Sequence, residues 1–139
     1  AESVGLNVPF LGGDGWAGLE GYATADQLKD SYFCANYAKG SSPEFEDAYK
    51  AEYGKDYPNG FAPLGYDAAM TVVYGIQAAE DAGLTAGDDD YKQAVIDAIA
   101  GGTIDGITGT FTFDEHHNPV KQTAILCFDG ATPVLKEMF

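Results

Sequence analysis

Apolar residues recur along this chain with two different periods, and the two periods predict two kinds of element. An apolar residue every third or fourth position over about 63–82 predicts the longest helix, which Gly83 ends. The same spacing predicts a helix over 43–53, ended by Gly54, and a third helix over about 90–100. Helices therefore occupy the middle of the chain.

The helix at 43 has the clearest start signal. Ser42 stands at the N-cap position and Pro43 at the first helical position, where its missing N–H costs nothing. Glu44 and Glu46 follow in the first turn, where the positive end of the helix dipole favours carboxylates. We expect Ser42 to cap this helix.

Alternating or continuous apolar runs predict strands on both sides of the helices. A short buried strand is expected just before Gly12, and another at about 31–37. After the helices, strands are expected over 109–114, over 120–128 as one long strand, and over 132–138. Three helices and about five strands form no complete series of strand–helix–strand units. Sheet edges would therefore be left unpaired, and unpaired edges tend to associate with other chains. The pattern predicts part of a larger α/β molecule, incomplete as given.

The opening residues fit this expectation. Residues 1–6 resemble the last turn of a helix that Gly5 ends before the first strand. The sequence therefore predicts a chain that begins within a fold.

The charge of the chain excludes one class of partner. Its 139 residues carry seven Lys, no Arg and 22 Asp and Glu, for a net charge of −15. Such a surface repels phosphate backbones and anionic membranes, so nucleic acid is not expected as a partner. No apolar run reaches the ~18 residues of a membrane span.

Motifs for catalysis or metal binding are not found. The sequence has no nucleophile elbow, no phosphate-binding loop and no complete dinucleotide fingerprint. His116 and His117 beside two carboxylates are the best metal candidates, but adjacent histidines in a hairpin turn do not easily converge on one ion. We therefore expect no enzyme, no metal and no cofactor.

Two cysteines, Cys34 and Cys127, leave their redox state open. Each lies in an apolar strand-like run, and their separation matches no zinc motif. Two free buried thiols and one disulfide are both compatible with the sequence, and the disulfide requires an oxidising compartment.

The candidate binding residues follow the first expected strand. Gly13, Asp14 and Trp16 place a carboxylate and an indole just beyond its carboxyl end, where open α/β sheets bind ligands. A carboxylate there can hold a cationic group, and an indole can cover an apolar or cationic one. The alternative is a Gly-rich turn with Trp16 packed in the core.

Five stretches, in this order, resemble the type I periplasmic binding proteins, closest to the leucine/isoleucine/valine-binding branch that serves ABC transporters. They are LNVPFLGGDGW at 6–16, DSYF at 30–33, SPEFEDAYKAEYG at 42–54, PLGYDAA at 63–69 and GITGTFTFD at 106–114. The resemblance covers the whole chain but only the C-terminal portion of a family member.

The resemblance implies a two-lobe α/β fold with parallel sheets flanked by helices. It assigns residues 1–38 and 121–139 to the C-terminal lobe and residues 42–119 to the N-terminal lobe. Both cysteines then belong to one lobe, which favours the Cys34–Cys127 disulfide. The missing N-terminal portion of the protein is an implied partner, and a dimer of such fragments is an alternative.

The resemblance also implies a function. The chain is expected to be the extracytoplasmic solute-binding component of an ABC importer, periplasmic or lipid-anchored, which binds an apolar amino acid between its lobes and meets the permease subunits. Asp14 then pairs with the ligand ammonium, Trp16 and Gly13 line the pocket, and Tyr66 approaches from the other lobe. Asp67 is expected to be structural. The alternative is a ligand-sensing domain on the same fold.

Overall fold

The computed structural model describes residues 2–139, which fold into two compact units. Unit 1 contains the residues up to 62 and residues 123–139, and unit 2 contains residues 63–122. The chain therefore passes from unit 1 to unit 2 after residue 62 and returns after residue 122.

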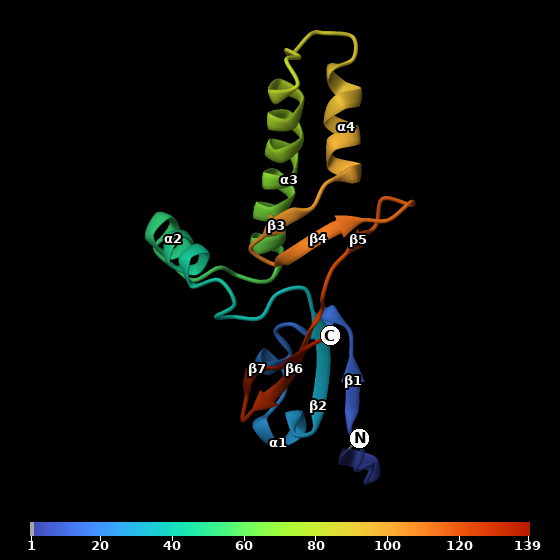
Figure 1. Cartoon of the computed structure of the whole chain (residues 1–139). Coiled ribbons are helices and arrows are strands. Elements are labelled where there is room, and N and C mark those ends of the chain that lie inside the picture. The colour runs from blue at the N-terminus through green and yellow to red at the C-terminus, as the bar shows by residue number, and fades with distance from the viewer. Residues whose placement is uncertain (1) are drawn as a thin grey trace. The chain divides into compact units, whose positions relative to one another are not determined.

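A four-stranded sheet forms the centre of unit 1 (Figure 1). Its order is β1 (Phe10–Gly12), β2 (Ser31–Ala35), β6 (Ala124–Asp129) and β7 (Thr132–Met138). The pair β1–β2 is parallel, and the other two pairs are antiparallel. The two ends of the sequence thus share one sheet.

One face of this sheet carries the core of unit 1. Phe33 lies opposite Leu126, and both are buried together with Ala38 and Ala124. Phe128 packs against this cluster and stacks on Phe33, with 5.4 Å between ring centroids. Residues alternate between the two faces of a strand, so Tyr32 and Cys34 of β2 and Ile125 and Cys127 of β6 point to the opposite face.

Short helical turns connect β1 to β2. They are η2 (Asp14–Trp16), η3 (Leu19–Gly21) and α1 (Ala25–Leu28), and a further turn, η1 (Glu2–Val4), precedes β1. Thr24 begins α1 with a capping box, in which Thr24 and Gln27 each accept a hydrogen bond from the other's backbone N–H. This cap explains how so short a helix forms.

Helix α2 (Pro43–Tyr53) follows β2 and ends at Gly54, whose φ of 69° suits glycine. The face predicted from its spacing is aromatic: Tyr49 lies 6.0 Å from Phe45 and 4.5 Å from Tyr53, between ring centroids. Ser42 occupies the N-cap position, but its side chain makes no capping hydrogen bond, so that expectation was wrong.

Unit 2 combines two helices with a small antiparallel sheet (Figure 1). Helices α3 (Phe61–Asp81) and α4 (Tyr91–Gly101) precede the strands β3 (Ile104–Gly106), β4 (Gly109–Phe113) and β5 (Pro119–Val120). Among residues 2–139, no helix is long and apolar enough to cross a membrane.

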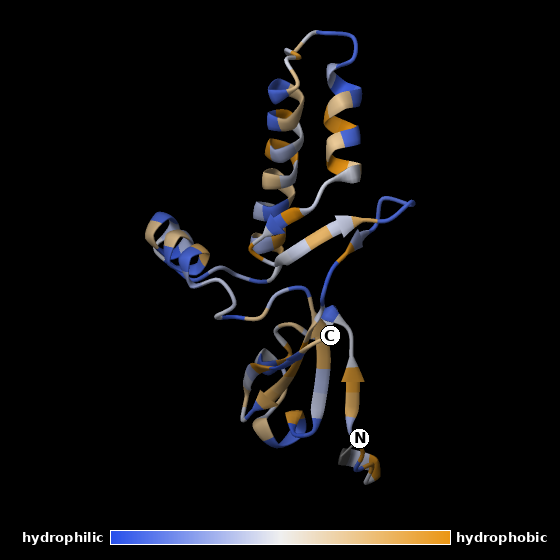
Figure 2. Ribbon diagram, viewed as in Figure 1, coloured by the Kyte–Doolittle hydropathy of each residue, from blue (hydrophilic) through white to orange (hydrophobic). Residues whose placement is uncertain are grey.

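The two helices of unit 2 approach closely at a glycine. A Cβ atom on Gly75 would lie 2.7 Å from the Ile99 side chain and 3.0 Å from that of Val95. The buried positions of α3 repeat every four residues, which makes a narrow stripe: Pro63, Asp67, Thr71, Gly75 and Ala79. Apolar residues also lie outside this stripe (Figure 2), and Met70 and Val73 are exposed.

The strand expected over 120–128 is two separate strands. Strand β5 ends at Val120 and β6 begins at Ala124, because the chain leaves unit 2 for unit 1 between them. The first strand was also expected to be buried, yet Leu11 at its centre is 80% exposed.

Both cysteines are free thiols, and the strand register explains why. Cys34 lies opposite Ile125, whereas Cys127 lies opposite Tyr32, so the thiols occupy diagonal positions on one face of neighbouring strands. Diagonal Cα atoms are about 7–8 Å apart, which exceeds the usual span of a disulfide. The Cys34 thiol instead lies 3.8 Å from the carbonyl oxygen of Gly12. The favoured Cys34–Cys127 disulfide is thus not present.

Candidate functional site

The loop after β1 is a single tight turn. Trp16 donates its backbone N–H to Gly13 O, and Ala17 donates to Asp14 O, each at 3.0 Å. Gly13 itself is extended, with φ −88° and ψ −174°, and leaves open space around its Cα. The turn therefore fixes Asp14 and Trp16 at the carboxyl end of a strand, as the sequence predicts.

Trp16 folds back over the end of β1. A Cβ atom on Gly12 would lie 2.1 Å from the nearest atom of the indole, so only glycine fits beneath the ring. Trp16 is partly buried and packs against the cluster that contains Phe33. The structure thus agrees in part with the alternative, in which Trp16 packs in the core. The role of Trp16 in a ligand pocket stays a prediction.

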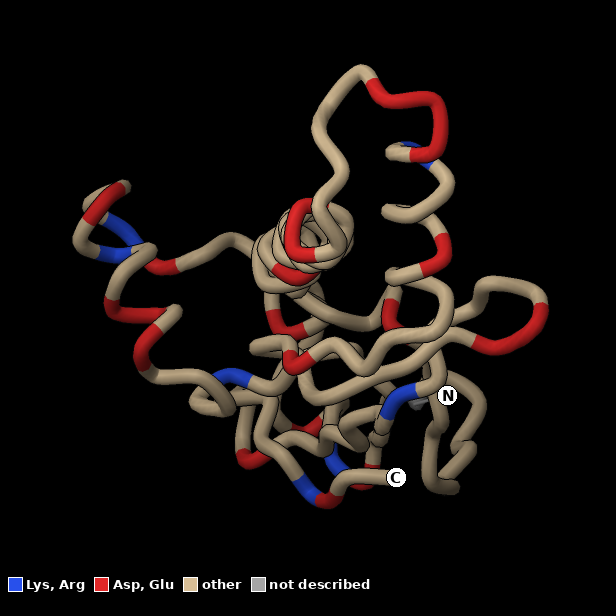
Figure 3. The backbone as a smooth tube through the Cα atoms, turned by 45° about the horizontal axis from the view of Figure 1, so that its top comes forward, with Lys and Arg blue, Asp and Glu red and all other residues tan. Residues whose placement is uncertain are grey.

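Asp14 begins the same turn that carries Trp16, and it is exposed. Among residues 2–139 its carboxylate takes part in no ion pair. By contrast, Lys39 and Lys50 both form ion pairs with the Asp56 carboxylate. Acidic residues are spread over both units (Figure 3), which leaves few cations to neutralise any one of them. An exposed carboxylate on a hydrogen-bonded turn is suited to a cationic group from outside.

Tyr66 belongs to unit 2, so its convergence with Asp14 stays a prediction. It lies in the second turn of α3 and is 46% exposed. Its neighbour Asp67 is 3% exposed and makes the contacts of a structural residue. The Asp67 carboxylate accepts the backbone N–H groups of Ile107 at 2.8 Å and Thr108 at 2.9 Å, and the Thr108 hydroxyl at 2.5 Å.

Lys121 extends this set of contacts. Its ammonium donates to Thr108 Oγ1 and lies 5.4 Å from the centroid of the Phe111 ring. Burial lowers the pKa of Lys121, while the negative charge of Asp67 opposes that effect. We call the chain of hydrogen bonds from Lys121 through Thr108 to Asp67 the relay. Sequence reasoning missed Lys121, because the contact joins residues distant in sequence.

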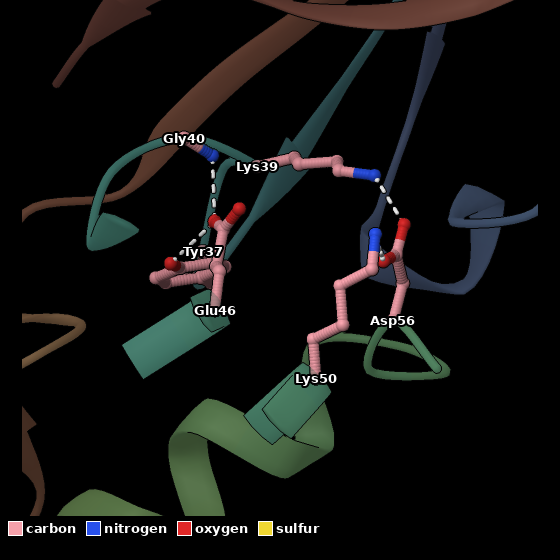
Figure 4. A network of polar contacts seen from close by, with 6 residues as sticks. All are labelled: Tyr37, Lys39, Gly40, Glu46, Lys50 and Asp56. Atoms are coloured by element: carbon pink, nitrogen blue, oxygen red, sulfur yellow. Dashed lines mark hydrogen bonds and ion pairs between the residues drawn. The ribbon is translucent and has the colours of Figure 1, made fainter. Parts of the chain in front are cut away.

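A second polar network lies around the start of α2 (Figure 4). Glu46 accepts the Tyr37 hydroxyl at 2.7 Å and the Gly40 N–H at 2.6 Å, so it holds the loop that precedes its own helix. Burial, and next the hydrogen bond to Glu46, raise the pKa of Tyr37 above its ordinary value. Only the placement of Glu46 in the first helical turn was foreseen from the sequence.

The same region has a shallow hollow next to this network. Lys39 and Lys50 contact Asp56 at 3.0 and 3.1 Å, and these two ion pairs lower the pKa of Asp56. The hollow measures about 200 Å³, less than the roughly 300 Å³ of the smallest usual ligand pockets. Its lysines are already paired with a carboxylate, so we do not assign it a ligand.

Metal binding finds no support in the residues that the structure describes. Within residues 2–139, no three His, Cys, Asp or Glu residues lie together as metal ligands would. His116 approaches Glu115 at 3.7 Å in the exposed turn before β5.

Comparison with known proteins identifies the fold. The sequence matches the family described as periplasmic binding protein over residues 1–131. A leucine-binding protein, LivK, from Thermotoga maritima superposes with a TM-score of 0.74 at 21% identity, over 100% of this chain and 39% of that one. LivJ from Streptococcus pneumoniae, in complex with isoleucine, has a TM-score of 0.69 at 26% identity, over 99% and 38%.

A third solved structure widens the range of ligands among these relatives. A solute-binding protein of an ABC transporter from R. palustris, in complex with benzoate, has a TM-score of 0.70 at 22% identity, over 94% of this chain and 36% of that one. The sequence has no significant match among curated proteins. The chain thus spans about two fifths of the length of the leucine-binding protein from T. maritima. With its α/β architecture and this match over most of its length, the chain belongs to the periplasmic binding protein family.

Proposed function

We propose that this chain is part of the solute-binding component of an ABC importer and that its ligand is an apolar amino acid, with a branched-chain amino acid the first candidate. The observation that carries the proposal is the Asp14 carboxylate, which forms no ion pair within the described residues 2–139 and shares a turn with Trp16 at the carboxyl end of β1.

The chemistry of this pair selects among the ligands of similar proteins. A carboxylate attracts an ammonium group through a charge-assisted hydrogen bond and repels a carboxylate. Isoleucine, bound in the S. pneumoniae protein, carries an ammonium group, whereas benzoate, bound in the R. palustris protein, does not. Asp14 therefore favours an amino acid over an aromatic acid, and the exposed rim of Trp16 would contact its apolar side chain.

The remaining partners follow from this role. As a binding component, the protein would act outside the cytoplasm, deliver its ligand to permease subunits and need no catalytic residue. A ligand-sensing domain on the same fold would bind in the same way. Genes for a permease and an ATPase next to this gene would support import, and a neighbouring kinase or regulator would support sensing.

We also propose the division into lobes that the family resemblance implies, with 1–38 and 121–139 in one lobe and 42–119 in the other. Met70 and Val73 of α3 are exposed and apolar, which supports the proposal that another part of the protein covers this helix. We assign that cover to the N-terminal portion of the same protein. Self-association of this chain through α3, measured by sedimentation, would instead favour the dimer of fragments.

The test is calorimetric titration of leucine, isoleucine, valine and benzoate into the protein expressed from its complete gene. We expect the aliphatic amino acids to bind and benzoate not to bind. A hydrogen bond to a charged group is worth about 1.5–3 kcal/mol, so Asp14→Asn should weaken leucine binding roughly ten- to a hundredfold. Glu20→Gln, which removes another exposed carboxylate of unit 1, is the matched control. Equal affinities of Asp14→Asn and the parent would refute the role of Asp14.

A further inference from the structure

The relay joins the two points at which the chain enters and leaves unit 2. Pro63, the first residue of the unit, is fully buried, and Asp67 follows one helical turn later. Lys121 is the last residue but one before the chain returns to unit 1. Through Thr108, these two ends of the unit are connected by side-chain hydrogen bonds.

Each hydrogen bond of the relay has one donor and one acceptor, and the direction of donation runs from Lys121 to Asp67. The Lys121 ammonium can only donate, and it donates to Thr108 Oγ1. The Thr108 hydroxyl then has its own hydrogen to give, and it donates to the buried carboxylate of Asp67. Thr108 is itself buried, at 6% exposed. A hydroxyl can accept a hydrogen bond from Lys121 and donate one to Asp67 at the same time. Valine would keep the shape of the side chain but could neither donate nor accept.

The turn at Thr108 also depends on Asp67. Two residues, Ile107 and Thr108, join β3 to β4, since Gly106 pairs with Gly109. Turns of this length ordinarily need positive φ, but among residues 2–139 the non-glycine residues with positive φ are Asp30 and His117. The Asp67 carboxylate instead receives both N–H groups of the turn. A Cβ atom on Gly106 would lie 2.5 Å from Asp67 Oδ2, so the backbone approaches as closely as it can.

We propose that Thr108 and Lys121 are positioning residues for ligand binding, which act through Asp67 on its neighbour Tyr66. The relay holds the second turn of α3, from which Tyr66 projects, and fixes both ends of unit 2. This inference rests on the proposed function, and it takes Tyr66 as a ligand contact, as the family resemblance implies. Loss of the relay loosens Tyr66 within unit 2, and it does not touch Asp14 and Trp16, which belong to unit 1.

The test compares Thr108→Val with Thr108→Ser in the complete protein. Thr110→Val is the matched control, because the Thr110 hydroxyl donates to an exposed carboxylate, Asp105, at 2.8 Å in the same hairpin. We expect Thr108→Val to weaken leucine binding by about tenfold. Thr108→Ser, which keeps the hydroxyl, and Thr110→Val should both bind leucine as the parent does.

Trypsin provides a readout of the anchor itself. Cleavage after Lys121 should speed up in Thr108→Val relative to cleavage after Lys92, which lies on α4 of the same unit. A general loss of stability would accelerate both cuts together and leave their ratio unchanged.

The outcomes separate this inference from the proposed function. A parent that binds no aliphatic amino acid refutes the proposed function. A parent that binds leucine, with Thr108→Val binding as tightly or being cut in the same ratio as Thr110→Val, refutes the relay. Leucine binding by Thr108→Ser that is as weak as that of Thr108→Val refutes the relay as well, because the hydroxyl would then not be the group that supports binding.

Discussion

Replacing Gly12 by alanine tests how the indole of Trp16 is held. The added methyl group would lie 2.1, 2.5 and 2.6 Å from three ring atoms, so the ring must move away from β1. Forcing extra volume into a packed site costs about 1–3 kcal/mol, and the displaced indole also loses its contact with the Phe33 cluster. We expect Gly12→Ala to destabilise unit 1 by about 2 kcal/mol. With a urea m-value of roughly 1–3 kcal/mol/M, this lowers the unfolding midpoint by about 1 M.

Trp16 reports this change directly, because it is the single tryptophan of the chain. Its emission should shift to longer wavelength in Gly12→Ala as the ring becomes more exposed to water, and urea unfolding followed by the same signal gives the midpoint. Gly13→Ala is the control: a Cβ atom there meets nothing within 4 Å, and a φ of −88° suits alanine. It should unfold like the parent or up to about 1 kcal/mol more stably. An unchanged emission and midpoint in Gly12→Ala would refute this packing of the indole.

Three further predictions concern unit 1. Tyr37→Phe removes the hydrogen bond that the hydroxyl donates to Glu46 and the one that it accepts from the Ser42 N–H. It should lower stability to urea by about 1–3 kcal/mol, since the part-buried Ser42 N–H loses its acceptor; an unchanged midpoint would contradict it. Burial, with nearby carboxylates, raises the pKa of Tyr57 from 10.0 to about 12. Its contribution to stability is therefore complete below pH 10 and is lost as the pH rises towards 12, and Tyr57→Phe should flatten this decline in thermal unfolding. Alkylation of the unfolded, unreduced chain followed by mass spectrometry should find both Cys34 and Cys127 modified; a mass two hydrogens lower without label would show the disulfide.

The sequence predicts elements where one local signal decides. Helix α2 begins and ends as its proline and Gly54 indicate, because these residues restrict the backbone at their own positions. The turn after β1 is likewise local, and its glycines place Asp14 and Trp16 where the pattern predicts them. Apolar periodicity could not show that 120–128 is interrupted, since its apolar residues on both sides suit a single strand.

The sequence does not reveal contacts between residues that are distant along the chain. Glu46 was expected to interact only with its helix dipole, but it also holds the loop at Gly40 and the hydroxyl of Tyr37. Lys121 carries no motif, and its contact with Thr108 depends on how β5 returns along the hairpin. The diagonal register that separates the two thiols is also a property of strand pairing. Such contacts are decided by tertiary packing, which a single sequence does not encode in any fixed spacing.

The hairpin of β3 and β4 has a consequence for the order of folding. Isolated hairpins form within about 1–10 μs, since their contacts are local. This hairpin has an unprimed turn, and its N–H groups find their acceptor 40 and 41 residues earlier in the chain. These N–H groups therefore gain their acceptor only after α3 has formed and presents the carboxylate of Asp67. Asp67→Ala, which removes the acceptor, should then accelerate unfolding more than it slows refolding, as is expected for contacts that form late in folding.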